Sequence, residues 1–136
     1  MKRKEPVQVV CAVLMKEDKV LLCQRSAIQT SPLKWELPGG KVMESETLEE
    51  ALTRELDEEL NIKPIIHEFT CTKSDQIKDI ELHAFLCSMP LNKQIKLTEH
   101  KDARWTTIDN ALLQDLCTAD REILLYISNQ SRFQTE

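Results

Sequence analysis

The stretch LPGGKVMESETLEEALTRELDEELNI, residues 37–62, joins two adjacent glycines to an acidic helix-like segment. Gly39 and Gly40 are the chain's two glycines, whereas an average sequence of 136 residues holds on the order of ten. Backbone freedom is therefore concentrated at one place. We expect Pro-Gly-Gly to form a tight turn that brings the backbone close to a ligand or a metal ion.

Capping and periodicity predict a helix after this turn. Thr47 and Glu50 fit a capping box, so the helix should begin near residue 48. Asn61 stands where a residue of left-handed conformation is expected to end the helix, and Pro64 prevents its continuation. The stripe that faces the core repeats every four residues and consists of Leu48, Leu52, Leu56 and Leu60.

The end of this helix carries acidic residues where a helix disfavours them. A helix C-terminus bears partial negative charge, and Glu55 and Glu59 also form a like-charge i,i+4 pair, which costs about 0.3 kcal/mol. Together with Glu58 they span an arc of roughly 100° beside the leucine stripe. Such oxygen donors suit a hard divalent cation such as Mg²⁺, which would relieve the repulsion. The alternative, a solvated acidic face, is disfavoured because the cluster follows the glycines.

The flanking segments predict a sheet covered by helices. We expect strands at residues 7–15, 20–26, 35–37, 65–73, 77–89 and 103–108. Two short helices should follow at residues 109–116, with Asp109 as a candidate cap, and 118–130, before a frayed tail at 131–136. Strands around one central helix, followed by terminal helices, indicate a single layered α/β domain with a mixed sheet over residues 1–136.

Composition excludes several classes of partner. The net charge of −5 provides no basic field for duplex nucleic acid. We expect a cytoplasmic protein without a membrane partner, because no apolar run reaches the length of a membrane span and no signal-peptide core is evident. The five cysteines are widely spaced and odd in number, which favours reduced thiols over a disulfide framework or a zinc motif.

Residues 40–62 resemble the Nudix box, whose pattern is G, five residues, E, seven residues, then R-E-apolar-x-E-E-x-G-apolar. Gly40, Glu46 and the run from Arg54 to Ile62 match every position except the last glycine, where this chain has Asn61. Asparagine tolerates the left-handed conformation, so the departure is mild. The order of segments is similar to that of MutT-type Nudix hydrolases over nearly the whole chain. The resemblance implies an α/β/α sandwich with a mixed β-sheet.

The resemblance also implies an activity: hydrolysis, dependent on Mg²⁺ or Mn²⁺, of a nucleoside diphosphate linked to another group. For the MutT type the small-molecule substrate is usually a nucleoside triphosphate, and the products are a monophosphate and pyrophosphate. Modified nucleotides of the cytidine or 8-oxoguanine type are candidates, and we expect a monomer or a homodimer. Two alternatives stay open: a hydrolase of a nucleoside-diphosphate sugar or a dinucleotide, ADP-ribose included, and a sensor that binds a nucleotide without cleaving it.

Site residues follow from the resemblance position by position. Arg54 would orient the glutamates, and Glu46 would bind Arg54 or fix the loop before the helix. The general base would be Glu55 or Glu99. Arg25 and Lys41 would neutralise the phosphates. The implied metal ligands are the Gly39 carbonyl and the carboxylates of Glu55, Glu58, Glu59 and Glu99.

Asp120 matches a position that contacts the nucleobase in MutT-type proteins. An ionised aspartate only accepts hydrogen bonds, so it would select the cytosine N4 amino group or the N1/N2 edge of guanine. In its sequence context it looks more like the cytidine-nucleotide enzymes. Alternatively, Asp120 is the N-cap of the last helix. Trp35 and Trp105 are expected to pack in the core or at its rim rather than to stack on a base, and His100 lacks ligand spacing.

Overall fold

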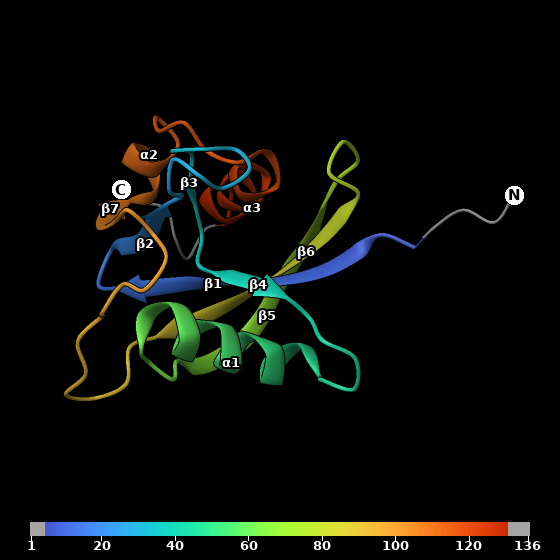
Figure 1. Ribbon diagram of the computed structural model, residues 1–136. Coiled ribbons are helices and arrows are strands. Elements are labelled where there is room, and N and C mark those ends of the chain that lie inside the picture. Colours follow the sequence, from blue (N-terminus) through green and yellow to red (C-terminus); the bar gives the residue numbers. More distant parts are fainter. Residues whose placement is uncertain (1–4, 131–136) are drawn as a thin grey trace, which may run out of the picture.

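The computed structural model describes residues 5–130 and contains one mixed sheet with helices on both faces (Figure 1). Its strands run in the order β3-β2-β1-β6-β5, while β4 pairs with β1 and β7 pairs with β2. The strands are β1 (Val7–Lys16), β2 (Lys19–Gln24), β3 (Trp35–Glu36), β4 (Gly39–Lys41), β5 (Ile65–Asp75), β6 (Ile80–Ser88) and β7 (Asp102–Thr107). The helices are α1 (Leu48–Leu60), α2 (Ile108–Ala111) and α3 (Thr118–Ser128). The expected frayed tail lies outside the described residues.

Strand β1 is the centre of the sheet. It forms an antiparallel hairpin with β2 and also runs parallel to β6, from Val7 opposite Ile80 to Met15 opposite Ser88. β6 in turn pairs antiparallel with β5. Both directions of pairing occur in one sheet, so the prediction of a mixed sheet is confirmed.

The two faces of β1 belong to two separate cores. Val10, Ala12 and Leu14 pack with the leucines of α1, whereas Cys11 and Val13 pack with residues of α2 and α3. A strand that is buried on both faces reads as a continuous apolar run, as β1 does. Figure 1 shows α1 on one side of the sheet and α3 on the other. The predicted α/β/α sandwich is confirmed.

The local signals around α1 are confirmed. Thr47 Oγ1 accepts a hydrogen bond from the Glu50 N–H at 3.1 Å, and Glu50 Oε1 accepts one from the Thr47 N–H at 2.9 Å. Asn61 ends the helix with φ 62° and ψ 34°, in the left-handed region. Leu52, Leu56 and Leu60 are fully buried.

The prediction of a tight Pro-Gly-Gly turn is wrong, because both glycines lie in β4, which pairs antiparallel with β1. Gly39 is opposite Cys11 and Gly40 is opposite Val10. A Cβ atom at Gly39 would lie 1.9 Å from the Val10 carbonyl oxygen. Glycine is therefore required at position 39 by the close approach of two strands rather than by a turn.

The helices after β7 begin at residues that the sequence did not single out. Thr107, not Asp109, caps α2, and its hydroxyl accepts from the Asn110 N–H at 3.2 Å. Cys117 caps α3 without a side-chain hydrogen bond. No helix within residues 5–130 is long and apolar enough to cross a membrane. All five cysteines are free, buried thiols.

Candidate active site

Arg54 connects the acidic residues of α1 to the segment before the helix. Its Nε and Nη2 donate to the two oxygens of Glu46, at 2.7 and 2.9 Å. Its Nη1 donates to Glu55 at 2.9 Å and to Glu58 at 3.4 Å. Nη2 also donates to the Lys41 carbonyl at 2.9 Å. The planar guanidinium therefore holds three glutamates at fixed positions, because each bond has a defined direction.

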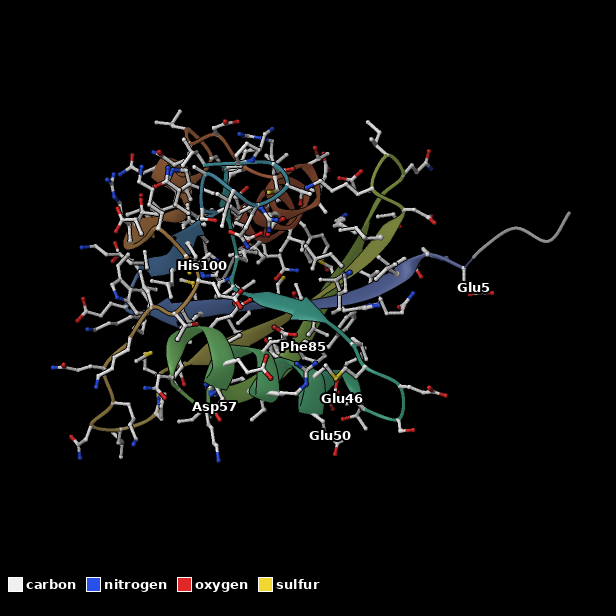
Figure 2. All side chains as sticks on the ribbon, in the orientation of Figure 1. Glu5, Glu46, Glu50, Asp57, Phe85 and His100 are labelled. Carbon is white, nitrogen blue, oxygen red and sulfur yellow. The ribbon has the colours of Figure 1, made fainter. Side chains whose placement is uncertain are left out.

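Glu46 has both of the roles that the sequence left open for it. Besides its paired contact with Arg54, it accepts a hydrogen bond from the Met43 N–H at 2.8 Å. The Arg54 bonds and the Met43 N–H lower the pKa of Glu46 to about 2. Glu46 is therefore a permanent anion that fastens the segment between β4 and α1 to the helix. Figure 2 shows by contrast that Glu50 and Asp57 point away from the sheet.

Glu59 is a buried carboxyl at the C-terminal end of α1. It is 8% exposed and accepts a hydrogen bond from the Gly39 N–H at 3.3 Å. Burial, followed by the charges of Glu55 and Glu36, raises the pKa of Glu59 to about 9. In the protein alone this carboxyl is therefore protonated at neutral pH. A bound cation would take the place of that proton.

Gly40 leaves room for a second carboxylate. A Cβ atom at this position would lie 2.4 Å from the Glu55 carboxyl carbon. Burial raises the pKa of Glu55, against the opposing effect of its hydrogen bond from Arg54. The two glycines thus act differently: Gly39 lets β4 approach β1 and donates to Glu59, while Gly40 lets the Glu55 carboxylate lie against the strand.

The segment before β7 brings Glu99 to this end of α1. The Thr98 N–H donates to the Glu59 carbonyl at 3.2 Å, and the Thr98 hydroxyl donates to the Glu58 carbonyl at 2.8 Å. These bonds satisfy carbonyls that the helix itself leaves free. The charge of Glu99 contributes to the raised pKa values of Glu55 and Glu59, after larger effects from burial and nearer charges. Its role as ligand or base stays a prediction.

Glu36 is a residue of the site that the sequence did not reveal. One of its oxygens accepts from Arg25 Nη1 at 2.9 Å, and the other lies 3.0 Å from His100 Nε2. Arg25 also donates to the Thr30 carbonyl at 2.6 Å. The available signal was the alternation in Trp-Glu-Leu, which puts Glu36 on the opposite side of the chain from its buried neighbours. Arg25 is held by protein contacts, and its role on phosphate stays a prediction, as does that of the exposed Lys41.

Asp120 ties α3 to the segment between β3 and β4. Its Oδ2 accepts a hydrogen bond from the Leu37 N–H at 2.9 Å, and the residue is 7% exposed. Burial, followed by the charge of Glu36, raises its pKa to about 7. The alternative that Asp120 is the N-cap of the last helix is wrong, because Cys117 occupies that position. Its contact with a nucleobase stays a prediction.

The donor set fits a hard divalent cation by its chemistry. Glu55, Glu58 and Glu59 supply carboxylate oxygens at one end of α1, which is what Mg²⁺ prefers. Burial, and after it the charges of Glu55 and Glu36, raises the pKa of Glu59, so a cation at this place would offset both effects. Within residues 5–130, however, no three His, Cys, Asp or Glu side chains are arranged as a preformed metal site. Glu55 and Glu58 bond to Arg54 instead, so they would share their oxygens between Arg54 and a cation.

Comparison with known proteins agrees with this arrangement. The NUDIX domain model matches residues 4–127. A CTP pyrophosphohydrolase of Escherichia coli K12 is 31% identical over 119 residues, which cover 87% of this chain and 88% of that protein. The nucleoside triphosphatase NudI of Escherichia coli O139:H28 is 28% identical to this chain, and the match covers 85% of this chain and 92% of the length of NudI. A MutT protein from Methanosarcina mazei Go1 superimposes with a TM-score of 0.77 at 25% identity, over 97% of this chain and 96% of that one. The chain therefore belongs to the NUDIX family and is a Nudix hydrolase.

Proposed function

We propose that this protein hydrolyses nucleoside or deoxynucleoside triphosphates, including modified ones, to a monophosphate and pyrophosphate with Mg²⁺ as cofactor. Mn²⁺ is a possible substitute. The observation that carries the proposal is the set of carboxylates at the end of α1, with Glu59 buried and Glu55 and Glu58 oriented by Arg54. The names of two relatives, a CTP pyrophosphohydrolase and a nucleoside triphosphatase, support triphosphates as the substrate class.

The proposed mechanism divides the work among the residues of this chain. Glu55, Glu58 and Glu59, with the Gly39 carbonyl and Glu99, would hold Mg²⁺, and the cation would supply neutralisation of the phosphate charge and activation of water. Arg54 keeps the glutamates in place through its four carboxylate contacts. Glu55 or Glu99 would accept the proton of the attacking water. Lys41 and Arg25 would bind the phosphate oxygens.

Asp120 is proposed to contact the nucleobase. Above its pKa of about 7 the carboxylate only accepts hydrogen bonds, and one oxygen already accepts from the Leu37 N–H. The other oxygen would accept from the amino group of cytosine, with guanine-type bases as the second choice. We further propose a cytoplasmic location, which the five free thiols support. We also propose a monomer or homodimer that requires no duplex nucleic acid and no membrane.

Release of pyrophosphate and of nucleoside monophosphate from a panel of substrates tests the proposal, because ADP-ribose would yield a monophosphate but no pyrophosphate. The panel contains the eight common triphosphates, 8-oxo-dGTP, 5-substituted dCTPs and ADP-ribose, each with and without Mg²⁺. We expect Mg²⁺-dependent release from one or two triphosphates. Release of products from ADP-ribose alone would move the substrate class to nucleoside diphosphates linked to a sugar, and binding without any product would indicate a sensor.

Substitution Glu58→Gln tests the carboxylate cluster itself. Glu58 is largely exposed, so the variant should fold normally while turnover falls by about 100-fold or more. Glu49→Gln is the matched control, because Glu49 is an exposed acid in the first turn of the same helix. If both variants turn over at the rate of the unmodified protein, the assignment of the cluster is wrong.

A further inference from the structure

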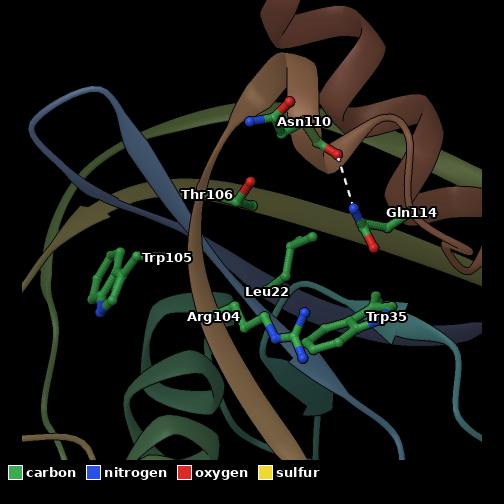
Figure 3. A pocket seen from close by; sticks show the side chains of 7 residues that line it. All are labelled: Leu22, Trp35, Arg104, Trp105, Thr106, Asn110 and Gln114. Atoms are coloured by element: carbon green, nitrogen blue, oxygen red, sulfur yellow. Dashed lines mark hydrogen bonds between the residues drawn. The ribbon is translucent and has the colours of Figure 1, made fainter.

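A pocket of about 260 Å³ lies on the face of the sheet opposite to α1 (Figure 3). Its floor is Leu22 of β2, which packs in the core beneath α2 and α3. The pocket shares no residue with the glutamate cluster around Arg54, nor with the contacts of Glu36 and Asp120. It is therefore a separate cavity, and the proposed hydrolysis gives it no role.

One wall of the pocket is formed by Arg104, whose guanidinium lies over the ring of the largely buried Trp35. The Arg104 guanidinium carbon lies 5.2 Å from the centre of the Trp35 ring, and both side chains line the cavity. Arg104 Nε also donates to Asp102 at 3.2 Å, so part of the guanidinium charge is compensated. Planar guanidinium and indole groups stack well on other planar, polarisable rings.

The opposite rim supplies carboxamides. The Asn110 side chain is exposed and forms no hydrogen bond with any of the residues 5–130. Gln114 Nε2 donates to the Asn110 carbonyl at 3.3 Å, which leaves the Gln114 side-chain oxygen as an acceptor. Figure 3 shows these two side chains on the far side of Leu22 from Arg104. The rim thus offers both donors and acceptors to the edge of a ligand.

We propose that this pocket binds an uncharged planar heteroaromatic ring of the nucleobase type, as a free base or nucleoside. The ring stacks on the Arg104 guanidinium, which itself lies over the Trp35 ring, and its polar edge bonds to Asn110 and Gln114. The volume lies just below the roughly 300–1,000 Å³ of sites for drug-sized ligands, which suits one small ring system. A polyphosphate is disfavoured, because Arg104 is the single cation of the lining and is already paired with Asp102.

The chain provides its own reporter for this site, because both of its tryptophans, Trp35 and Trp105, line the pocket. Adenosine and cytidine are titrated into ¹⁵N-labelled protein in the presence of EDTA, which removes any contribution of a metal-dependent site. We expect shifts of the Trp35 indole N–H signal and of the Asn110 and Gln114 carboxamide signals. The dissociation constant for so few ligand atoms should be about 1 mM.

Two variants and one control decide the proposal. Asn110→Ala and Gln114→Ala should each weaken binding about tenfold. Gln76→Ala, an exposed glutamine in the turn between β5 and β6, should leave binding unchanged. Thermal unfolding of all three variants confirms that they fold. The proposal is overturned if neither nucleoside shifts the Trp35 signal, if the pocket variants bind like the control, or if the shifts fall on Gly39 and Gly40 instead.

Discussion

Asp120 illustrates how one buried carboxyl acquires an unusual proton affinity. It lies in the first turn of α3 and accepts a hydrogen bond from the Leu37 N–H, and burial, followed by the charge of Glu36, raises its pKa to about 7. The pKa of Asp120 is higher in the folded protein than in the unfolded chain, so the protonated carboxyl stabilises the folded protein. This contribution is complete at pH values below the pKa of the unfolded chain. That contribution disappears as the pH rises through about 7.

The variant Asp120→Asn should remove this pH dependence. Asparagine retains an oxygen for the Leu37 N–H but does not ionise, so the melting temperature should fall less between pH 5 and pH 8 than in the unmodified protein. Thermal unfolding across this range measures the difference. Asp18→Asn, in the exposed turn between β1 and β2, is the control and should leave the slope unchanged. Equal slopes for all three proteins would contradict the burial argument.

At the scale of elements, the packing of β4 between β1 and α1 depends on two glycines with different neighbours. An added methyl at Gly39 meets the backbone of β1, which cannot yield without breaking the strand pairing. An added methyl at Gly40 meets the end of the Glu55 side chain, which can rotate away. The same substitution should therefore affect stability at one position and catalysis at the other.

Gly39→Ala and Gly40→Ala form a matched pair. Gly39→Ala should lower the free energy of unfolding by more than about 3 kcal/mol. Gly40→Ala should change it by less than about 1 kcal/mol, while turnover falls because the Glu55 carboxylate is displaced. Urea unfolding and pyrophosphate release measure the two effects. A Gly40→Ala variant with full turnover would show that the position of Glu55 is not required.

At the scale of the whole molecule, bound Mg²⁺ should link the site to global stability. A cation that binds only the folded protein stabilises it by about 2.7 kcal/mol at a concentration one hundred times its dissociation constant. The melting temperature should therefore rise with Mg²⁺ and return to its starting value with EDTA. The rise should be smaller in Glu59→Gln, which keeps an oxygen for the Gly39 N–H but lacks the charge. An equal rise in both proteins would place the cation elsewhere.

The predictions that succeeded around α1 rest on contacts close in sequence. The capping box, the leucine stripe, the left-handed Asn61 and the pairing of Arg54 with Glu46 all lie within residues 46–61. Among those that failed, the cap expected at Asp109 is wrong because the nearby Thr107 caps α2, whereas the other two involve distant segments. The glycines form a strand rather than a turn because β1 is beside them. Asp120 lies inside the first turn of α3, behind Cys117, and its carboxylate accepts from the distant Leu37 N–H.

The sequence by itself determined the helix α1, the glutamates at its end and the layered fold, because periodicity, capping and charge spacing are local properties of a chain. Only the tertiary structure decided the environment of those groups. It buried Glu59 and Asp120, joined Glu36 to Arg25 and His100, and placed Trp35 and Arg104 on one pocket wall. Burial and electrostatic fields depend on which distant segments meet, and that is fixed by packing across the sheet rather than by neighbours in the chain.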